Sequence, residues 1–338
     1  MATELPSMHN TDHFPLDRGY LFSGNGVGRE IDANTAITWL KHGDDTSTEF
    51  IWLHFHDIPG VLEGWPLQHV QLPEEFGDTL REGSRSTRIT HVYQTLIAVL
   101  NDVEYDFTRR KPLKVATLWL NVGARCLLSV RSSSLRSVGE LRQAVEAGET
   151  FHSPMALLIQ LLQEQADVLI DIVRAAAQAA NDVDETLIAG RLPTRSILGG
   201  LRRDLVRLRR LLAPEPAALF RLVNRPPRWV LEEDAQSLGQ SAEEFSLTLR
   251  DMGGLQERIK LLEDEIADRV AEHTNRSVLI LTAVTVIALP VNLISGLLGM
   301  NIGGLPLKYD NHGFWIVAVI ALLLTSVAAW LIFRPRKD

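Results

Sequence analysis

Two long uncharged stretches near the end of the sequence constrain its fold more than any other feature. Residues 277–298 carry no charged side chain over 22 positions, and residues 314–333 carry none over 20. About 20 apolar residues in a helix cross the roughly 30 Å hydrocarbon core of a bilayer. Either stretch alone could be the core helix of a soluble protein. Two such stretches, only 15 residues apart, predict a membrane hairpin.

The basic residues around the two stretches predict their orientation. Arg269 and Arg276 precede the first stretch, and three basic residues follow the second within 334–338. The connecting segment, 299–313, holds one lysine against one aspartate. Because cytoplasmic flanks carry the excess of Lys and Arg, both termini are expected in the cytoplasm.

Composition argues against several other classes of protein. The chain has 46% apolar residues and a net charge of −8, and this content of apolar residues excludes a wholly disordered chain. Its single cysteine, Cys126, excludes an internal disulfide bond. The acidic balance argues against a nucleic-acid partner. The sequence has no GxxxxGK(S/T) motif and no nucleophile–base arrangement, so we expect neither an enzyme nor a resident cofactor. The run Gly24–Gly28 lacks the GxGxxG spacing and predicts a turn.

The part before the first apolar stretch has two sections. Up to about residue 150, short β-type runs mix with helical ones, and beyond Pro154 the pattern is nearly all helical. Strands are expected at 50–56, 88–99, 115–121 and 125–130, and helices at 137–147, 155–188, 194–212 and from about 230 onward. The predicted fold class is an α+β membrane protein with an N-terminal cytosolic α/β domain, a long helical stalk and two C-terminal transmembrane helices.

Breaks in the pattern set the expected boundaries. The last long helix follows the pair Pro226-Pro227, and nothing interrupts it between Gln256 and the first apolar stretch. One continuous helix is therefore expected to enter the membrane. The expected segments are a polar tail (1–20), the α/β domain (21–152), the helical section and stalk (153–276), transmembrane helix 1 (277–298), an outer loop (299–313), transmembrane helix 2 (314–333) and a basic tail (334–338).

The stalk carries a register of apolar positions in alternating steps of three and four. Its members are Phe245, Thr248, Met252, Leu255, Ile259, Leu262 and Ile266. This 3.5-residue period is typical of helices that pack side by side. Gly253 and Gly254 weaken the helix locally, each by about 1 kcal/mol relative to Ala.

The same register continues through the first apolar stretch as a polar stripe. Its members are Asn275, Val278, Thr282, Thr285, Leu289, Asn292 and Gly296. The other faces are almost entirely Leu, Ile, Val and Ala. Polar groups without partners are costly in hydrocarbon, so the stripe is expected to face protein or water. The stripe would either hold neighbouring helices together or, in a symmetric oligomer, line a narrow pore.

Acidic residues extend the stripe toward the cytoplasmic side. Asp264 and Asp268 lie on it, and His273 lies just below the first apolar stretch. As an approach to a pore, they would attract cations, and His273 would titrate near neutral pH. As ordinary stalk residues, they would only be solvated. Both interpretations remain open at this point.

The first apolar stretch ends in Gly299-Met300-Asn301, and this resembles the signature of the CorA family of divalent-cation transporters. Thr274-Asn275 at the junction and Leu289-Pro290 in mid-span match the family too. The residues that follow, Ile-Gly-Gly-Leu-Pro at 302–306, look more like the ZntB zinc-transporter branch. Met300 departs from that branch, which often changes the middle residue of the signature.

The resemblance implies a homopentamer in a bacterial inner membrane, with a pore that carries Zn²⁺ inward. Asn301 would hold the hydrated ion through outer-sphere hydrogen bonds, with Gly299 and Met300 beside it at the entrance. The implied pore lining is Asn275, Val278, Leu281, Thr282, Thr285, Leu289, Asn292 and Gly296. The implied partners are other copies of the chain, the lipid bilayer and the transported cations. A Mg²⁺, Co²⁺ or Ni²⁺ channel is the alternative, and a membrane-tethered sensor or scaffold is an alternative of another class.

His54 and His56 raise a separate possibility of metal binding. They lie on one face of an expected strand, as a zinc pair would. No third ligand is identifiable by its spacing from them. We therefore interpret both as ordinary histidines.

Overall fold

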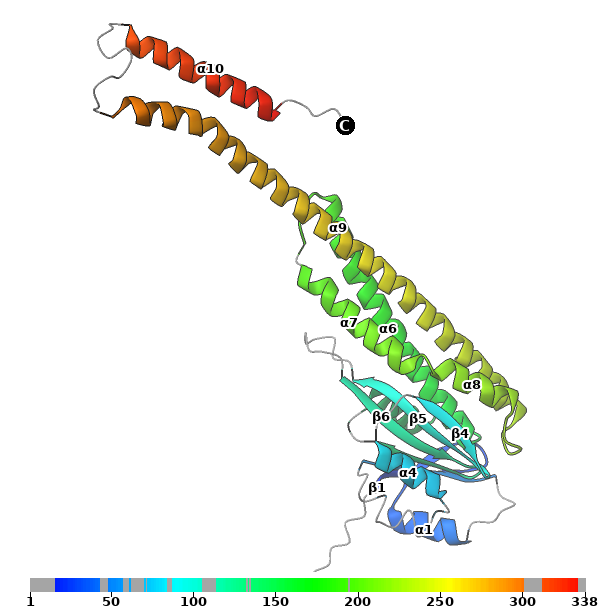
Figure 1. The fold of residues 1–338 in the computed structure, drawn as a ribbon. Coiled ribbons are helices and arrows are strands. Elements are labelled where there is room, and N and C mark those ends of the chain that lie inside the picture. The colour runs from blue at the N-terminus through cyan, green and yellow to red at the C-terminus, as the bar shows by residue number, and fades with distance from the viewer. Residues whose placement is uncertain are drawn as a thin grey trace, which may run out of the picture. The chain divides into compact units, whose positions relative to one another are not determined.

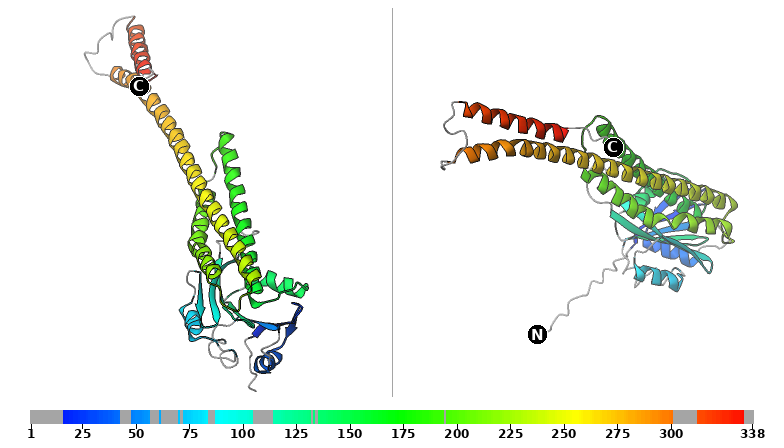
Figure 2. Two further views of the ribbon diagram at one scale, coloured as in Figure 1. Left: turned by 90° about the vertical axis from the view of Figure 1, so that its right-hand side faces the viewer. Right: turned by 45° about the horizontal axis from the view of Figure 1, so that its top comes forward.

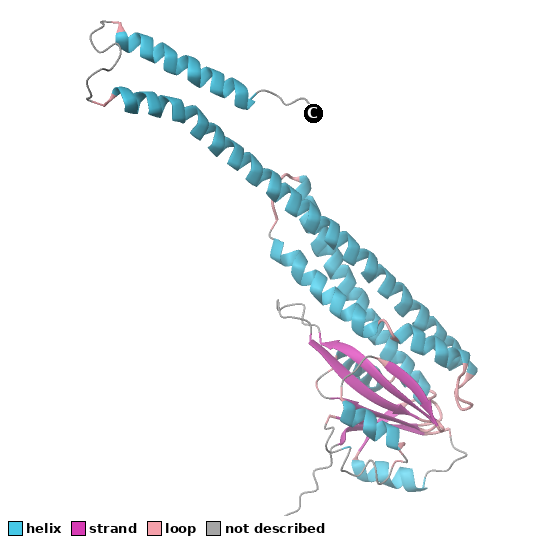
Figure 3. Cartoon of the chain, viewed as in Figure 1, coloured by secondary structure: helices cyan, strands magenta, loops and turns pink. Residues whose placement is uncertain are grey.

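The computed structural model describes residues 16–42, 48–56, 61, 70, 72–83, 87–104, 114–131, 133, 135–193, 195–300 and 312–333. The chain divides into two compact units, residues 1–185 with 194–261, and residues 186–193 with 262–338. The named strands of the described chain all lie between Leu16 and Arg131, and the later elements are helices (Figure 3).

A seven-stranded mixed sheet forms the centre of the first unit (Figure 1). Its strands are β1 (Leu16–Phe22), β2 (Gly28–Ile31), β3 (Phe50–Phe55), β4 (Arg88–Val92), β5 (Thr95–Glu104), β6 (Lys114–Val122) and β7 (Cys126–Arg131). Their order is β2-β1-β3-β7-β6-β5-β4, and the pair β3–β7 is parallel while its neighbours pair antiparallel. Every residue of β3 is buried, as expected of a central strand with both faces covered.

Helices cover both faces of this sheet (Figures 1 and 2). The helices around it are α1 (Ala33–His42), α4 (Glu74–Glu82) and α5 (Arg136–Glu146). On one face, Phe76 of α4 packs in one core cluster with Leu53 and Val99. Alternate strand residues point to the opposite face. There, Asp102 of β5 accepts a 2.6 Å hydrogen bond from the Ser137 hydroxyl of α5.

The remainder of the described chain is helical. Its helices are α6 (Pro154–Ile188), α7 (Arg195–Leu212), α8 (Glu215–Asn224), α9 (Glu232–Leu298) and α10 (Gly313–Phe333). The predicted stalk register is confirmed, because all seven members from Phe245 to Ile266 are buried. The structure also explains Gly253, since a Cβ there would stand 3.2 Å from the Arg209 guanidinium carbon of α7. The glycine leaves room for the end of the Arg209 side chain.

The structure departs from the sequence-based expectation in the N-terminal part. The strand expected at 88–99 is two strands, β4 and β5, joined at Tyr93 and Gln94. Tyr93 has a φ of 53°, and no Gly or Asn in this turn signals it. Strand β1 begins at Leu16, inside the segment expected as a polar tail. Strand β2 and helices α1, α4 and α8 were not expected either. The turn expected at Gly24–Gly28 is present between β1 and β2, closed by the Gly26 N–H donating to the Ser23 carbonyl at 2.8 Å.

Within the part of the chain that the structure describes, two helices are long and apolar enough to cross a membrane. The most apolar windows of α9 and α10 have mean hydropathies of 2.3 and 2.2, and 6% of each window is buried within the chain. A core helix of a soluble protein would be mostly buried. The low burial therefore favours two helices that face lipid or other copies of the chain.

Candidate functional site

The polar stripe lies on a helix without a break. Helix α9 runs from Glu232 to Leu298, with Pro290 accommodated inside it. From Asn275 to Gly296 the rise is about 31 Å at 1.5 Å per residue. This matches the roughly 30 Å hydrocarbon core of a bilayer. The stripe is therefore long enough to reach from one side of a membrane to the other.

Every member of the stripe is exposed in the single chain. Val278, Leu281 and Leu289 are 55%, 68% and 64% exposed. Val284 and Leu293, which lie off the stripe, are exposed to the same degree, 60% and 61%. Exposure in one chain thus does not separate the stripe from the positions of Val284 and Leu293, although Ala283 on another face is only 4% exposed. What distinguishes the stripe is its polarity.

The Thr285 hydroxyl shows how a polar group is accommodated on this helix. Its Oγ1 donates to the Leu281 carbonyl, one turn earlier, at 2.9 Å. With the proton committed to the backbone, the lone pairs of the oxygen remain as acceptors. An acceptor suits a cation or its water shell. Thr325 of α10 makes the same bond to Ala321 at 2.7 Å, so the bond itself is not specific to the stripe.

The end of α9 leads into the signature residues. The Gly299 N–H donates to the Ser295 carbonyl at 2.9 Å, and the Met300 N–H donates to the Leu297 carbonyl at 3.4 Å. Helical hydrogen bonding therefore extends past Leu298 into the signature. Met300 is 46% exposed. Asn301 lies outside the described residues.

The proposed cytoplasmic approach lies on the same helix. Asp264, Asp268 and His273 are all exposed on α9. Between them, Arg269 donates from Nη1 to the Leu187 carbonyl and from Nη2 to Glu265, both at 2.7 Å. Sequence reasoning used Arg269 only as a flanking charge. In the structure it satisfies a carbonyl at the C-terminal end of α6, as a basic residue commonly does there.

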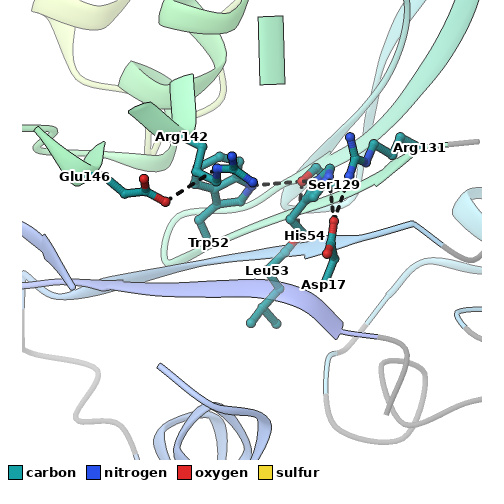
Figure 4. A network of polar contacts seen from close by, with 8 residues as sticks. All are labelled: Asp17, Trp52, Leu53, His54, Ser129, Arg131, Arg142 and Glu146. Carbon is teal, nitrogen blue, oxygen red and sulfur yellow. Dashed lines mark hydrogen bonds and ion pairs between the residues drawn. The ribbon is translucent and has the colours of Figure 1, made fainter. Parts of the chain in front are cut away.

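The two histidines of the possible zinc pair differ in their burial. His54 is buried, and its Nδ1 lies 2.8 Å from the Ser129 hydroxyl (Figure 4), whereas His56 is exposed. Among the described residues, no group of three or more His, Cys, Asp or Glu side chains is placed to hold a metal ion. Sequence reasoning did not anticipate the polar network around His54, because its members come from distant strands and a helix.

An N-terminal α/β domain, a long helix and two apolar C-terminal helices define a membrane protein of the two-span transporter class. The family described as "CorA-like Mg2+ transporter protein" matches residues 47–336, and the chain belongs to it. It is accordingly a divalent-cation transporter rather than an enzyme.

Individual relatives agree with this assignment. The chain is 27% identical to "Divalent cation transporter CmaX" of Pseudomonas aeruginosa, over 96% of this chain and 97% of the relative. It is 24% identical to "Zinc transport protein ZntB" of Yersinia pseudotuberculosis, over 86% of this chain and 89% of the relative. The solved structure of full-length CmaX covers 97% of this chain and all of its own, with a TM-score of 0.82 at 26% identity.

Proposed function

We propose that the protein carries Zn²⁺ into the cell through a central pore formed by five copies of the chain. The observation that carries this proposal is the polar stripe on the uninterrupted helix α9. The stripe is about as long as the hydrocarbon core of a membrane is thick. One chain with two membrane helices cannot enclose a pore. Several copies around an axis would place their stripes together, away from lipid. The number five comes from the family resemblance.

The chemistry of the stripe suits a hydrated divalent cation. Hydroxyl and amide oxygens from Thr282, Thr285 and Asn292 are dipoles without net charge, so an ion can bind and still leave. Apolar Val278, Leu281 and Leu289 would form narrow points that gate by excluding water. Asn301 would hold the hydrated ion at the outer entrance, beside Gly299 and Met300. The remaining lining positions are Asn275 and Gly296.

Location follows from the same features. The two apolar helices would cross a bacterial inner membrane with both termini in the cytoplasm, as the flanking basic residues indicate. Asp264, Asp268 and His273 would then lie on the cytoplasmic side of the pore. Carboxylates in that position would draw the ion out of the pore by simple attraction.

Zinc is the proposed cargo because of two observations. The relatives named as zinc transporters match this chain over most of its length, and the resemblance of Ile-Gly-Gly-Leu-Pro at 302–306 to the zinc branch points the same way. A Mg²⁺, Co²⁺ or Ni²⁺ channel is the second candidate. It is favoured by Met300, which keeps the signature in its Gly-Met-Asn form.

Flux measurements in proteoliposomes test the pore and the cargo separately. Wild-type protein should admit Zn²⁺ faster than Mg²⁺ at equal concentration, and the reverse order would favour the second candidate. Asn301→Ala should abolish flux of either ion while the oligomer still assembles.

A matched pair of threonines tests the stripe itself. Thr285→Val should reduce flux, because it removes an oxygen from the stripe. Thr325→Val removes the same kind of hydroxyl, with the same backbone bond, from α10. It should leave flux unchanged. Equal effects of the two substitutions would contradict a pore lined by α9.

A further inference from the structure

A small cleft opens on the α5 face of the sheet in the first unit. Its lining includes Asp17, Arg18, His54, Arg131, Gly139 and Arg142. The empty volume, open solvent included, is about 280 Å³. Because part of that volume is open solvent, the enclosed part of the cleft has room for no more than a small ion or water.

The strand register brings these residues together. His54 of β3 lies beside Ser129 of β7, and Arg131 follows on the same face two residues later. The pairing of β1 with β3 shifts between Leu16 and Arg18. Such a bulge re-aims a side chain. Here the Asp17 carboxylate reaches Arg131 Nη2 at 2.8 Å (Figure 4).

Hydrogen bonds assign the ring proton of His54. The Ser129 hydroxyl oxygen accepts from Trp52 Nε1 at 2.8 Å. Its own proton can go to His54 Nδ1 at 2.8 Å or to the Leu53 carbonyl at 3.4 Å. We assign it to the shorter contact, which places the imidazole proton on Nε2. Burial lowers the pKa of His54 to about 3, so the ring is neutral at neutral pH.

Three buried N–H donors of residues that line the cleft make no hydrogen bond. They are His54 Nε2, Arg131 Nε and Arg142 Nε, of which the last lies 3.4 Å from its ion-pair partner Glu146. The nearest carboxylate oxygen to Nε2, from Asp17, is 4.0 Å away. A buried donor without an acceptor costs about 1–3 kcal/mol. Such donors in a native fold call for a ligand or ordered water.

In the lining itself, guanidinium groups outnumber carboxylates. Arg18, Arg131 and Arg142 contribute guanidinium groups to the lining, against the single carboxylate of Asp17. Two further carboxylates pair with these arginines from outside the lining, Glu30 with Arg18 and Glu146 with Arg142. A cation would find only Asp17 as a charged ligand, and Asp17 already accepts from Arg131.

From these observations we propose that the cleft binds a small oxyanion of the phosphate or sulfate class. One oxygen of the anion accepts hydrogen bonds from His54 Nε2 and Arg131 Nε. Its other oxygens face the open mouth, near Arg142 and Arg18. Binding would link the β1 bulge, β3, β7 and α5 through a single ion.

Gly139 offers a test that leaves every charge in place. It lies in α5 and lines the cleft, and a Cβ there would meet no atom within 4 Å. Gly139→Leu should therefore fold and fill the cleft. The control is Gly254→Leu, at a helical glycine of α9 that is equally open and does not line the cleft.

The experiment is calorimetric titration of inorganic phosphate and of sulfate into metal-free, full-length protein in detergent, with chloride titrated at matched ionic strength. Phosphate or sulfate should bind saturably to the wild type and to Gly254→Leu, but not to Gly139→Leu. Arg142→Gln should weaken binding about tenfold, the equivalent of one charge-assisted hydrogen bond. If Gly139→Leu fails to fold, the affinity of Arg142→Gln for phosphate and sulfate tests the proposal by itself.

Three results would overturn the proposal. The first is the absence of saturable phosphate or sulfate binding to the wild type. The second is unchanged binding in both cleft variants. The third is tighter binding of glycerol 3-phosphate than of inorganic phosphate, which would assign the cleft to an organic phosphate rather than to a free oxyanion.

Discussion

A Cβ atom on Gly299 would stand 2.9 Å from the backbone carbonyl oxygen of Ser295, the same oxygen that accepts the Gly299 N–H bond at 2.9 Å. Real Cβ atoms do not approach a carbonyl oxygen so closely. The glycine of the signature is thus required by the backbone of the last turn. It lies where the chain leaves α9.

Gly299→Ala should therefore reduce cation flux strongly, by displacing the entrance rather than by removing a ligand. Proteoliposome flux and the oligomeric state in detergent measure the effect. Gly254→Ala is the control, because a Cβ there meets nothing within 4 Å. It should keep full flux and add about 0.5–1 kcal/mol of helix stability. Wild-type flux in Gly299→Ala would contradict the role given to this turn.

Cysteine substitution should distinguish the stripe from the other faces of α9. In a pore, Thr285→Cys and Asn292→Cys would meet water and react with small polar thiol reagents. Val284→Cys and Leu293→Cys would face lipid or protein and should not react. All four positions are exposed in the single chain, so the difference arises only in the assembly. Equal labelling of the two pairs would show that the stripe lines no water.

The native thiol is a small background in that experiment. Burial raises the pKa of Cys126 to about 12, which leaves almost no reactive thiolate at neutral pH. Cys126→Ala removes what remains. The labelling is read by mass increase in intact oligomers.

Transport should run inward under the membrane potential. One charge gains about 2.3 kcal/mol per 100 mV, so a divalent cation gains about 4.6 kcal/mol on entering a negative interior. The stripe from Asn275 to Gly296 contains no titratable side chain to carry protons in exchange. Candidates for proton modulation, such as His273, lie outside it.

Liposomes with a zinc-sensitive dye and an imposed potassium diffusion potential provide the measurement. Zinc influx should rise as the interior is made more negative. A pH gradient should change the rate without replacing the potential. Influx that ignores the potential and follows only a proton gradient in the exchange direction would overturn this prediction.

Glu215 should make the stability of the fold dependent on pH. It is fully buried at the start of α8, and neither carboxyl oxygen has a hydrogen-bond partner. Burial, and secondarily the charge of Asp102, raises the pKa of Glu215 well above its usual value. The folded protein therefore holds this proton to higher pH than the unfolded chain. The pH-dependent loss of folding stability that Glu215 causes is absent below the pKa that Glu215 has in the unfolded chain. It grows as the pH rises from there toward the pKa of Glu215 in the folded protein.

Glu215→Met should accordingly unfold at a higher temperature than the wild type near neutral pH. Its free energy of unfolding should be larger by about 1–3 kcal/mol, the cost of a buried unsatisfied polar group. The gain should shrink toward pH 4. Thermal unfolding followed between pH 4 and pH 8 tests this. Glu257→Met, at an exposed position on α9, is the control and should show no such trend. A gain that does not depend on pH would mean that Glu215 stays neutral throughout.

The helical part of the fold could be predicted from the sequence because its signals are local. Charge-free length indicated the two apolar helices, and a 3.5-residue period indicated which residues of α9, such as Phe245 and Ile259, are buried. Both patterns repeat within a few turns of one helix. The polar stripe and the signature were found in the same way, and the residues of the proposed pore come from them.

The α/β domain was decided by tertiary structure. Strand β1, the short helices α1, α4 and α8, and the hairpin at Tyr93 carry weak local signals, and packing against the sheet determines their conformation. The cleft beside His54 exists only because strand pairing and a β-bulge bring Asp17, His54 and Arg131 into contact. These residues are distant in sequence and share no periodicity. Local sequence patterns therefore predict which face of one helix a residue lies on. Contacts between residues of separate strands depend instead on the register of the whole sheet.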